Sequence, residues 1–131
     1  MIYLDSSAIF KLVRQEPESD ALEAWLTTPV QAPHVSSALA LVEVIRSARR
    51  VDATGERDAR RVLATLALIP MTQDILDEAV TVGDPLLRTL DAIHVATALS
   101  VRLDLTAVVT YDRRLAAAAT RAGLHTVSPL P

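Results

Sequence analysis

The sequence predicts an α/β fold, a three-layer α/β/α sandwich with a mostly parallel central sheet. Short apolar runs that favour strands alternate along the chain with segments whose apolar residues recur at helical spacing. The links between these segments are short, and no Asn-Gly pair marks a hairpin between neighbouring strands. With 131 residues, of which 50% are hydrophobic, the chain suits a single domain over 1–131 with a core of its own.

In the first half of the chain, apolar runs and capping residues predict two strands and three helices. MIYL at 1–4 is a short β-rich run, and the two serines after Asp5 can cap a helix. Prolines flank a second helix over 18–26, and a weak strand follows near 30–34. A second serine pair is expected to cap a long helix over 36–51.

The second half continues the alternation of strands and helices. Apolar spacing predicts a helix over 54–68, and LIPM at 68–71 is a short strand. Thr72 is expected to cap the next helix, which ends before Gly83, and Thr89 to cap a longer one. The remaining predictions are a strand at 106–111, a helix over 112–122 closed by Gly123, and a terminal strand at 125–127.

Composition limits the kind of protein. The chain has no cysteine, which excludes disulfides and thiolate metal sites and agrees with a reducing cytoplasm. The N-terminal run lacks a basic leader, and no later segment reaches the roughly 18 apolar residues of a membrane span. We therefore expect a cytoplasmic protein that does not contact a membrane. Its net charge of −3 does not attract polyanions overall, so binding of nucleic acid requires a local basic patch.

Four acidic residues stand where acids are unexpected: Asp5, Glu43, Asp91 and Asp112. Asp5 and Asp112 follow predicted strands, at the edge where open parallel sheets place their ligand sites. Glu43 lies in a helical segment that is apolar on nearly all sides, where an unpaired buried carboxylate costs several kcal/mol. Asp91 opens a helix whose following turns are apolar. The four acids are therefore candidates for one common site.

Each acid also has a structural explanation. Asp5 and Asp112 occupy positions typical of helix caps, although Ser6 can cap the first helix and leave Asp5 free. An acid in a first helical turn, such as Asp91, interacts favourably with the helix dipole. Glu43 can instead form a buried ion pair with an arginine.

If the four carboxylates do meet, they require a cation to offset their repulsion. Oxygen ligands suit a hard ion such as Mg²⁺ or Mn²⁺, which can activate water for attack on a phosphodiester. Because crowded carboxylates repel without metal, Glu43→Gln is expected to raise the melting temperature of the metal-free protein.

The motifs around these acids resemble the PIN domain over essentially the whole chain. They are LDSSAIFKL with Asp5, the isolated Glu43, TLDAIHVATAL with Asp91, and VVTYDRRLAAAA with Asp112, followed by Gly123. Within that family the chain is most similar to the VapC toxins of bacterial toxin–antitoxin pairs. The resemblance implies a Mg²⁺- or Mn²⁺-dependent endoribonuclease that forms a homodimer and is neutralised by a small antitoxin.

The resemblance also implies roles for individual residues. Asp5, Glu43 and Asp91 match the three core acids of the family, and Asp112 matches a fourth that varies more between members. Ser7 and Thr110 match small hydroxyl positions that support such a metal site through hydrogen bonds. His94, on an apolar helix face, is interpreted as a buried core residue and not as a catalytic one.

One basic concentration stands out on this acidic chain. Arg46, Arg49 and Arg50 lie in a short window that continues into another arginine-rich segment. They form either a solvated helical face or a contact for RNA or for the antitoxin.

Two other functions remain open from the sequence, a housekeeping RNA-processing PIN nuclease and a non-catalytic PIN-fold binding module. Retention of all four acids favours an active enzyme. A receiver domain and a haloacid dehalogenase-type phosphatase are disfavoured, because residues 4 and 7 are Leu and Ser where those sites need a further acid.

Overall fold

The structure is a computed structural model that describes residues 1–28 and 32–131. Within these ranges five strands form one sheet in the order β3-β2-β1-β4-β5, and every ladder between neighbours is parallel. The strands are β1 (Ile2–Leu4), β2 (His34–Ser37), β3 (Ala67–Ile69), β4 (Ala107–Val109) and β5 (Thr126–Val127).

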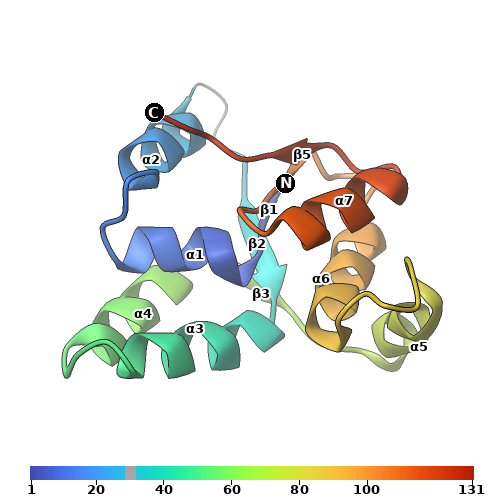
Figure 1. Ribbon diagram of the computed structural model, residues 1–131, viewed down its shortest axis with the longest axis horizontal. Helices are drawn as coiled ribbons and strands as arrows, with labels where there is room; N and C mark the ends of the chain where they lie inside the picture. Colours follow the sequence, from blue (N-terminus) through green and yellow to red (C-terminus); the bar gives the residue numbers. More distant parts are fainter. Residues whose placement is uncertain (29–31) are drawn as a thin grey trace.

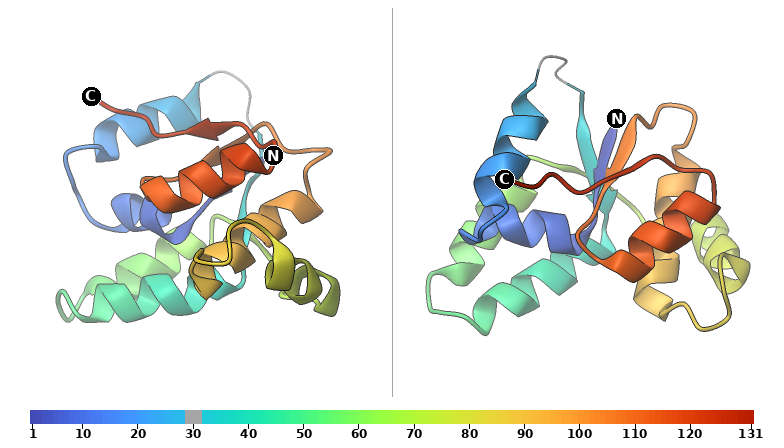
Figure 2. Two further views of the ribbon diagram at one scale, coloured as in Figure 1. Left: turned by 45° about the vertical axis from the view of Figure 1, so that its right-hand side comes forward. Right: turned by 45° about the horizontal axis from the view of Figure 1, so that its top comes forward.

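Helices cover both faces of the sheet, as Figures 1 and 2 show. One layer contains α1 (Ser6–Val13), α2 (Ser19–Thr27), α3 (Leu39–Arg49) and α4 (Gly55–Leu63). The other layer contains α5 (Gln73–Thr81), α6 (Thr89–Ser100) and α7 (Arg113–Arg121). This arrangement confirms the predicted three-layer sandwich. Among the described helices, none is long and apolar enough to cross a membrane.

The sheet separates two apolar cores because side chains alternate along its short strands. Ile2 and Leu4 of β1 pack with Ile9 of α1 and Val44 of α3. Tyr3, between them, points into the opposite core, whose members include residues of α6 and α7. Both faces of β1 are therefore buried, as expected for the central strand of a parallel sheet.

The serine pair at the end of β2 was wrongly assigned to a helix cap. Ser36 and Ser37 belong to the strand, and both are fully buried. The Ser36 hydroxyl donates a 2.6 Å hydrogen bond to the carbonyl oxygen of Leu4, and Ser37 Oγ accepts one from Leu39 N–H at 3.1 Å. Because these bonds satisfy the hydroxyls, the strand extends to Ser37. Of the strand predicted near 30–34, positions 30 and 31 lie outside the described residues.

Two other helix limits differ from the sequence prediction. The helix predicted over 54–68 ends at Leu63, since residues 67–69 pair with β2 as strand β3. Thr89 is the first residue of α6 and not its cap, because Arg88 occupies the cap position. Thr72, in contrast, caps α5 as predicted, with its hydroxyl accepting a 3.3 Å hydrogen bond from Ile75 N–H.

This topology places several chain segments at one edge. β1 pairs with β2 on one side and with β4 on the other, so the carboxyl ends of these three strands lie together. The helices α1, α3 and α7 begin beside this edge, each shortly after its strand. Open parallel sheets bind their ligands at this edge, next to the switch in strand order.

Candidate active site

Asp5 directly follows β1 and caps α1. Its Oδ1 accepts hydrogen bonds from Ala8 N–H at 3.0 Å and from the Ser7 hydroxyl at 2.7 Å. Its Oδ2 accepts a 2.7 Å hydrogen bond from the Thr110 hydroxyl. The expectation that Ser6 would cap this helix and free Asp5 was therefore wrong. Burial raises the pKa of Asp5, although the hydrogen bonds from Ser7, Thr110 and Ala8 act in the opposite direction.

The two predicted supporting hydroxyls lie in direct contact with Asp5. Ser7 Oγ also accepts a 2.9 Å hydrogen bond from Tyr111 N–H, and Thr110 Oγ1 accepts a 3.0 Å hydrogen bond from Asp112 N–H. Each hydroxyl thereby joins the end of β1 to the segment after β4. These bonds hold the Asp5 carboxylate at a fixed place on the sheet edge.

Asp112 caps α7, as its structural explanation predicts. Its Oδ1 accepts hydrogen bonds from Arg114 N–H at 2.8 Å and from Leu115 N–H at 3.2 Å. Its Oδ2 makes no hydrogen bond with the described residues, and the side chain is half-buried. Asp112 therefore combines a capping role with one carboxylate oxygen available for a ligand.

Asp91 lies in the first turn of α6, and one of its carboxylate oxygens is orphaned. Oδ2 of Asp91 is buried and has no hydrogen-bond partner among the described residues. Burial raises the pKa of Asp91, the negative charge of Asp112 adds to this effect, and that of Asp5 adds less. Two of the other predicted acids, Asp112 and Asp5, thus act electrostatically on Asp91.

Glu43 occupies the second turn of α3 and is turned toward α6. Its Oε1 accepts hydrogen bonds from the Ser6 hydroxyl at 2.5 Å and from His94 Nε2 at 2.7 Å. Burial alone would raise the pKa of Glu43, but the hydrogen bonds from His94 and Ser6 lower it below its ordinary value. The partner of Glu43 is therefore a histidine and not the arginine that the sequence alternative named.

His94 is buried, as interpreted from the sequence, but it belongs to the same group of side chains. Its side chain is 3% exposed, and Nδ1 lies 2.7 Å from the Tyr3 hydroxyl. Sequence reasoning missed its contact with Glu43. The available signal was its position three residues after Asp91, because residues at that spacing share one helix face.

The site combines limited metal-binding geometry with a chemistry that suits a cation. No three of the described histidine, aspartate and glutamate side chains stand close enough together to hold one ion between them. Their chemistry nevertheless suits a hard cation, because Asp91 Oδ2 is buried without a partner. The pKa values of Asp5 and Asp91 are also raised by burial, so a cation at this edge would stabilise their charged forms.

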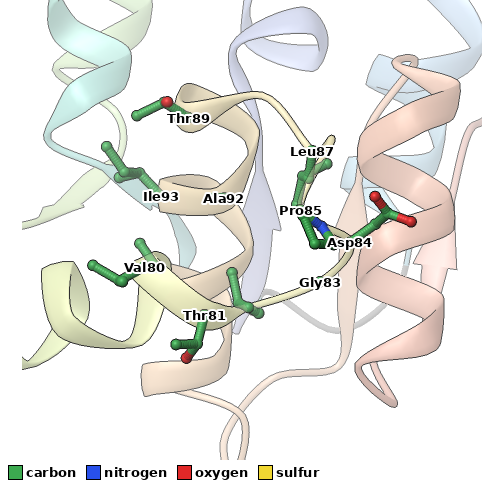
Figure 3. Close-up of a pocket in the computed structure, with 11 residues that line it drawn as sticks. Val80, Thr81, Gly83, Asp84, Pro85, Leu87, Thr89, Ala92 and Ile93 are labelled. Atoms are coloured by element: carbon green, nitrogen blue, oxygen red, sulfur yellow. The ribbon is translucent and has the colours of Figure 1, made fainter.

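The acids do not line the cavity drawn in Figure 3, which has a volume of about 570 Å³. That cavity lies between α5, which contributes Val80 and Thr81, α6, which contributes Ala92 and Ile93, and the loop at 83–87. The cavity is therefore separate from the candidate site at the sheet edge.

The predicted basic residues lie at the far end of α3. Arg46, Arg49 and Arg50 are exposed and form no ion pair with the described residues. In α4, by contrast, Arg60 pairs with Glu56 at 3.2 Å and Arg61 with Asp58 at 3.7 Å. The charges of the α3 arginines are thus available to another molecule.

Comparison with known proteins identifies the family. The chain matches the PIN domain family over residues 2–121. The chain belongs to the PIN-domain family. Ribonuclease VapC46 of Mycobacterium tuberculosis is 46% identical to this PIN domain over 128 residues, covering 98% of this chain and 97% of that protein. Ribonuclease VapC47 of the same species is 40% identical over 132 residues with the same coverage. This PIN domain is thus a member of the VapC group.

Solved structures share the fold of this PIN domain. Mycobacterium tuberculosis VapC20, described as a sarcin-ricin loop cleaving toxin, superposes with a TM-score of 0.74 at 18% identity, covering 98% of this chain and all 100% of that one. A toxin–antitoxin complex from Klebsiella pneumoniae gives a TM-score of 0.65 at 24% identity, covering 86% of this chain and 87% of that one. At these identities the likeness extends to the fold alone.

Proposed function

We propose that this PIN domain is a Mg²⁺- or Mn²⁺-dependent endoribonuclease that hydrolyses RNA phosphodiester bonds as the toxin of a type II toxin–antitoxin pair. The observation that carries the metal requirement is the orphaned Oδ2 of Asp91, which is buried beside other carboxylates. The curated relatives VapC46 and VapC47 are named ribonucleases, which supports RNA as the substrate.

The four acids have distinct parts in this proposal. Asp91 and Asp112 would hold the ion through oxygens that make no hydrogen bond with the described residues. Asp5 would add a charge whose place is fixed by Ser7 and Thr110, and Glu43 would contribute from α3. When bound, the ion lowers the pKa of water and neutralises charge on the leaving oxygen.

The chain's own residues would prepare this edge before RNA arrives. The hydroxyls of Ser7 and Thr110 prevent the Asp5 carboxylate from turning away, so little reorganisation is needed when ligand binds. The exposed α3 arginines would attract the RNA backbone or an acidic segment of the antitoxin. A homodimer in the cytoplasm, controlled by a VapB-like antitoxin, completes the proposal.

The proposal is tested with purified protein and a pool of total RNA. Cleavage should require Mg²⁺ or Mn²⁺, should stop with chelator, and should yield defined ends when the 5′ termini are mapped. Asp91→Asn should abolish cleavage while the fold is retained. Asp74→Asn is a matched control, since Asp74 occupies the first turn of α5 as Asp91 does that of α6, but is exposed. Cleavage that persists in chelator, or in Asp91→Asn, would contradict the proposal.

A further inference from the structure

A chain of two hydrogen bonds runs from the buried core to the partly exposed acidic edge. The Tyr3 hydroxyl lies 2.7 Å from His94 Nδ1, and His94 Nε2 lies 2.7 Å from Glu43 Oε1. Tyr3 is fully buried, and His94 is 2% exposed. The chain therefore connects β1, α6 and α3 and ends on a carboxylate of the proposed active site.

The direction of each hydrogen bond follows from what a carboxylate and a neutral imidazole can donate or accept. An ionised carboxylate only accepts, so the proton between His94 and Glu43 belongs to Nε2. In a neutral ring Nδ1 is then an acceptor, and the Tyr3 hydroxyl donates to it. The Ser6 hydroxyl gives the same Glu43 oxygen a second hydrogen bond, at 2.5 Å. Oε2 of Glu43 makes no hydrogen bond with the described residues, so one oxygen is held and the other remains available.

Packing does not account for this arrangement. An aliphatic side chain at position 94 would fill a core site without the desolvation cost of an imidazole. Glu43, in contrast, lies on a partly exposed turn of α3, where its neighbour Val42 is 55% exposed. A carboxylate on such a turn samples several rotamers unless a fixed donor holds it.

We propose that His94 is a positioning residue, which holds Glu43 at the acidic edge through Nε2 while the Tyr3 hydroxyl fixes its tautomer. This inference rests on the proposed function only where RNA cleavage is measured. Ligand-orienting partners of this kind affect metal affinity or activity by about 10- to 100-fold when they are removed.

Two double variants isolate the hydrogen bond to Glu43. Tyr3→Phe/His94→Leu removes the imidazole without leaving a buried hydroxyl unpaired, and Tyr3→Phe/His94→Gln restores an N–H donor in a side chain of similar size. The two proteins differ chiefly in that donor. Ser19→Ala serves as a stability control, because Ser19 is fully buried and its hydroxyl bonds to Lys11 and Arg14 carbonyls, away from the acids.

The expected result is a kcat lower by about 10- to 100-fold in the Leu variant, with little change in KM, and a Mn²⁺ affinity that falls in parallel by calorimetry. The Gln variant should recover most of both. Equal values for the Leu and Gln variants, or a loss no larger than that of Ser19→Ala at equal stability, would overturn the role of His94.

A measurement on the wild-type protein tests the same inference without RNA. Long-range ¹⁵N correlation spectra assign the histidine tautomers, and His94 should carry its proton on Nε2. A proton on Nδ1 would overturn the inference even if the Leu variant fails to fold. If wild type does not cleave RNA, the proposed function fails, while the tautomer and the Mn²⁺ affinities still decide the role of His94.

Discussion

Thr110 donates a 2.7 Å hydrogen bond to Oδ2 of Asp5, from a position 105 residues further along the chain. The same hydroxyl accepts the backbone N–H of Asp112 at 3.0 Å. One buried hydroxyl thus links two of the proposed metal-binding acids across the β1–β4 pair.

Thr110→Val should therefore impair stability and activity together. The substitution keeps the side-chain shape but leaves a buried carboxylate oxygen and a backbone N–H without partners, at a cost of about 1–3 kcal/mol. Urea unfolding measures this loss. Ser19→Ala is the control, because Ser19 is also fully buried but its hydroxyl donates to the Lys11 and Arg14 carbonyls, away from the acids. Equal losses of stability and activity in both variants would show that the hydrogen bond from Thr110 to Asp5 contributes no more than any other buried hydroxyl.

Asp91→Asn should raise the melting temperature of the metal-free protein at pH 7. The pKa of Asp91 is higher in the folded than in the unfolded protein. The protonated side chain therefore contributes stability below the unfolded-state pKa of about 3.9, and this contribution is lost as pH rises. Removing the charge should thus stabilise at neutral pH, and the gain should vanish near pH 3. Each kcal/mol shifts the melting temperature of such a chain by about 4 °C.

With added Mn²⁺ the wild type should instead melt at a higher temperature than Asp91→Asn, because its native state binds the ion more tightly. Asp74→Asn, at an exposed position, should change stability by less than about 0.5 kcal/mol in either condition. If Asp91→Asn melts below the wild type at pH 7 in the presence of chelator, the Asp91 carboxylate does not destabilise the metal-free protein.

Glu43→Gln should show the opposite dependence on pH. The sequence alone predicts a gain without metal, but hydrogen bonds from His94 and Ser6 lower the folded-state pKa of Glu43. Its stabilising contribution is thus present above the unfolded value of about 4.3 and is lost as pH falls. We expect Glu43→Gln in chelator to cost about 1–3 kcal/mol at pH 7. Chemical denaturation across pH 3 to 7 measures this, and a gain at pH 7 would restore the original expectation.

The α3 arginines should contribute to RNA binding through charge. The triple variant Arg46→Gln/Arg49→Gln/Arg50→Gln should lower the salt dependence of single-stranded RNA binding by about 2 in the log–log slope. Binding is measured in chelator so that RNA is not cut. Three Arg→Gln changes in α4 at positions 57, 60 and 61 remove the same charge and should have a smaller effect, because two of these arginines are already paired. Equal slopes for the two triple variants would mean that Arg46, Arg49 and Arg50 form only a solvated helical face.

The sequence predicts the layers of the fold and the edge at which the acids lie. Asp5 and Asp112 were found because each follows an apolar run that forms a buried strand, and the pattern of such a run is local. The serines at 36 and 37 were misassigned, since a hydroxyl inside a strand is acceptable only when a distant group satisfies it. Here that group is the Leu4 carbonyl of the neighbouring strand.

The partner of Glu43 was not predictable for a related reason. Whether Glu43 meets an arginine or a histidine depends on how α3 and α6 are placed around the sheet edge, and no short-range pattern encodes that. The same limit applies to the dual role of Asp5, because the choice between Asp5 and Ser6 as cap depends on the Ser6 hydroxyl reaching Glu43.

The central place of β1 has a consequence for the protein during translation. β1 emerges from the ribosome first, yet its neighbour β4 spans Ala107–Val109 and is made much later. Until that segment has emerged, Asp5 lacks the Thr110 hydroxyl, and Asp112 does not yet exist beside it. No nascent fragment that stops short of residue 112 can assemble the acidic edge, so the proposed activity would belong to the completed domain alone.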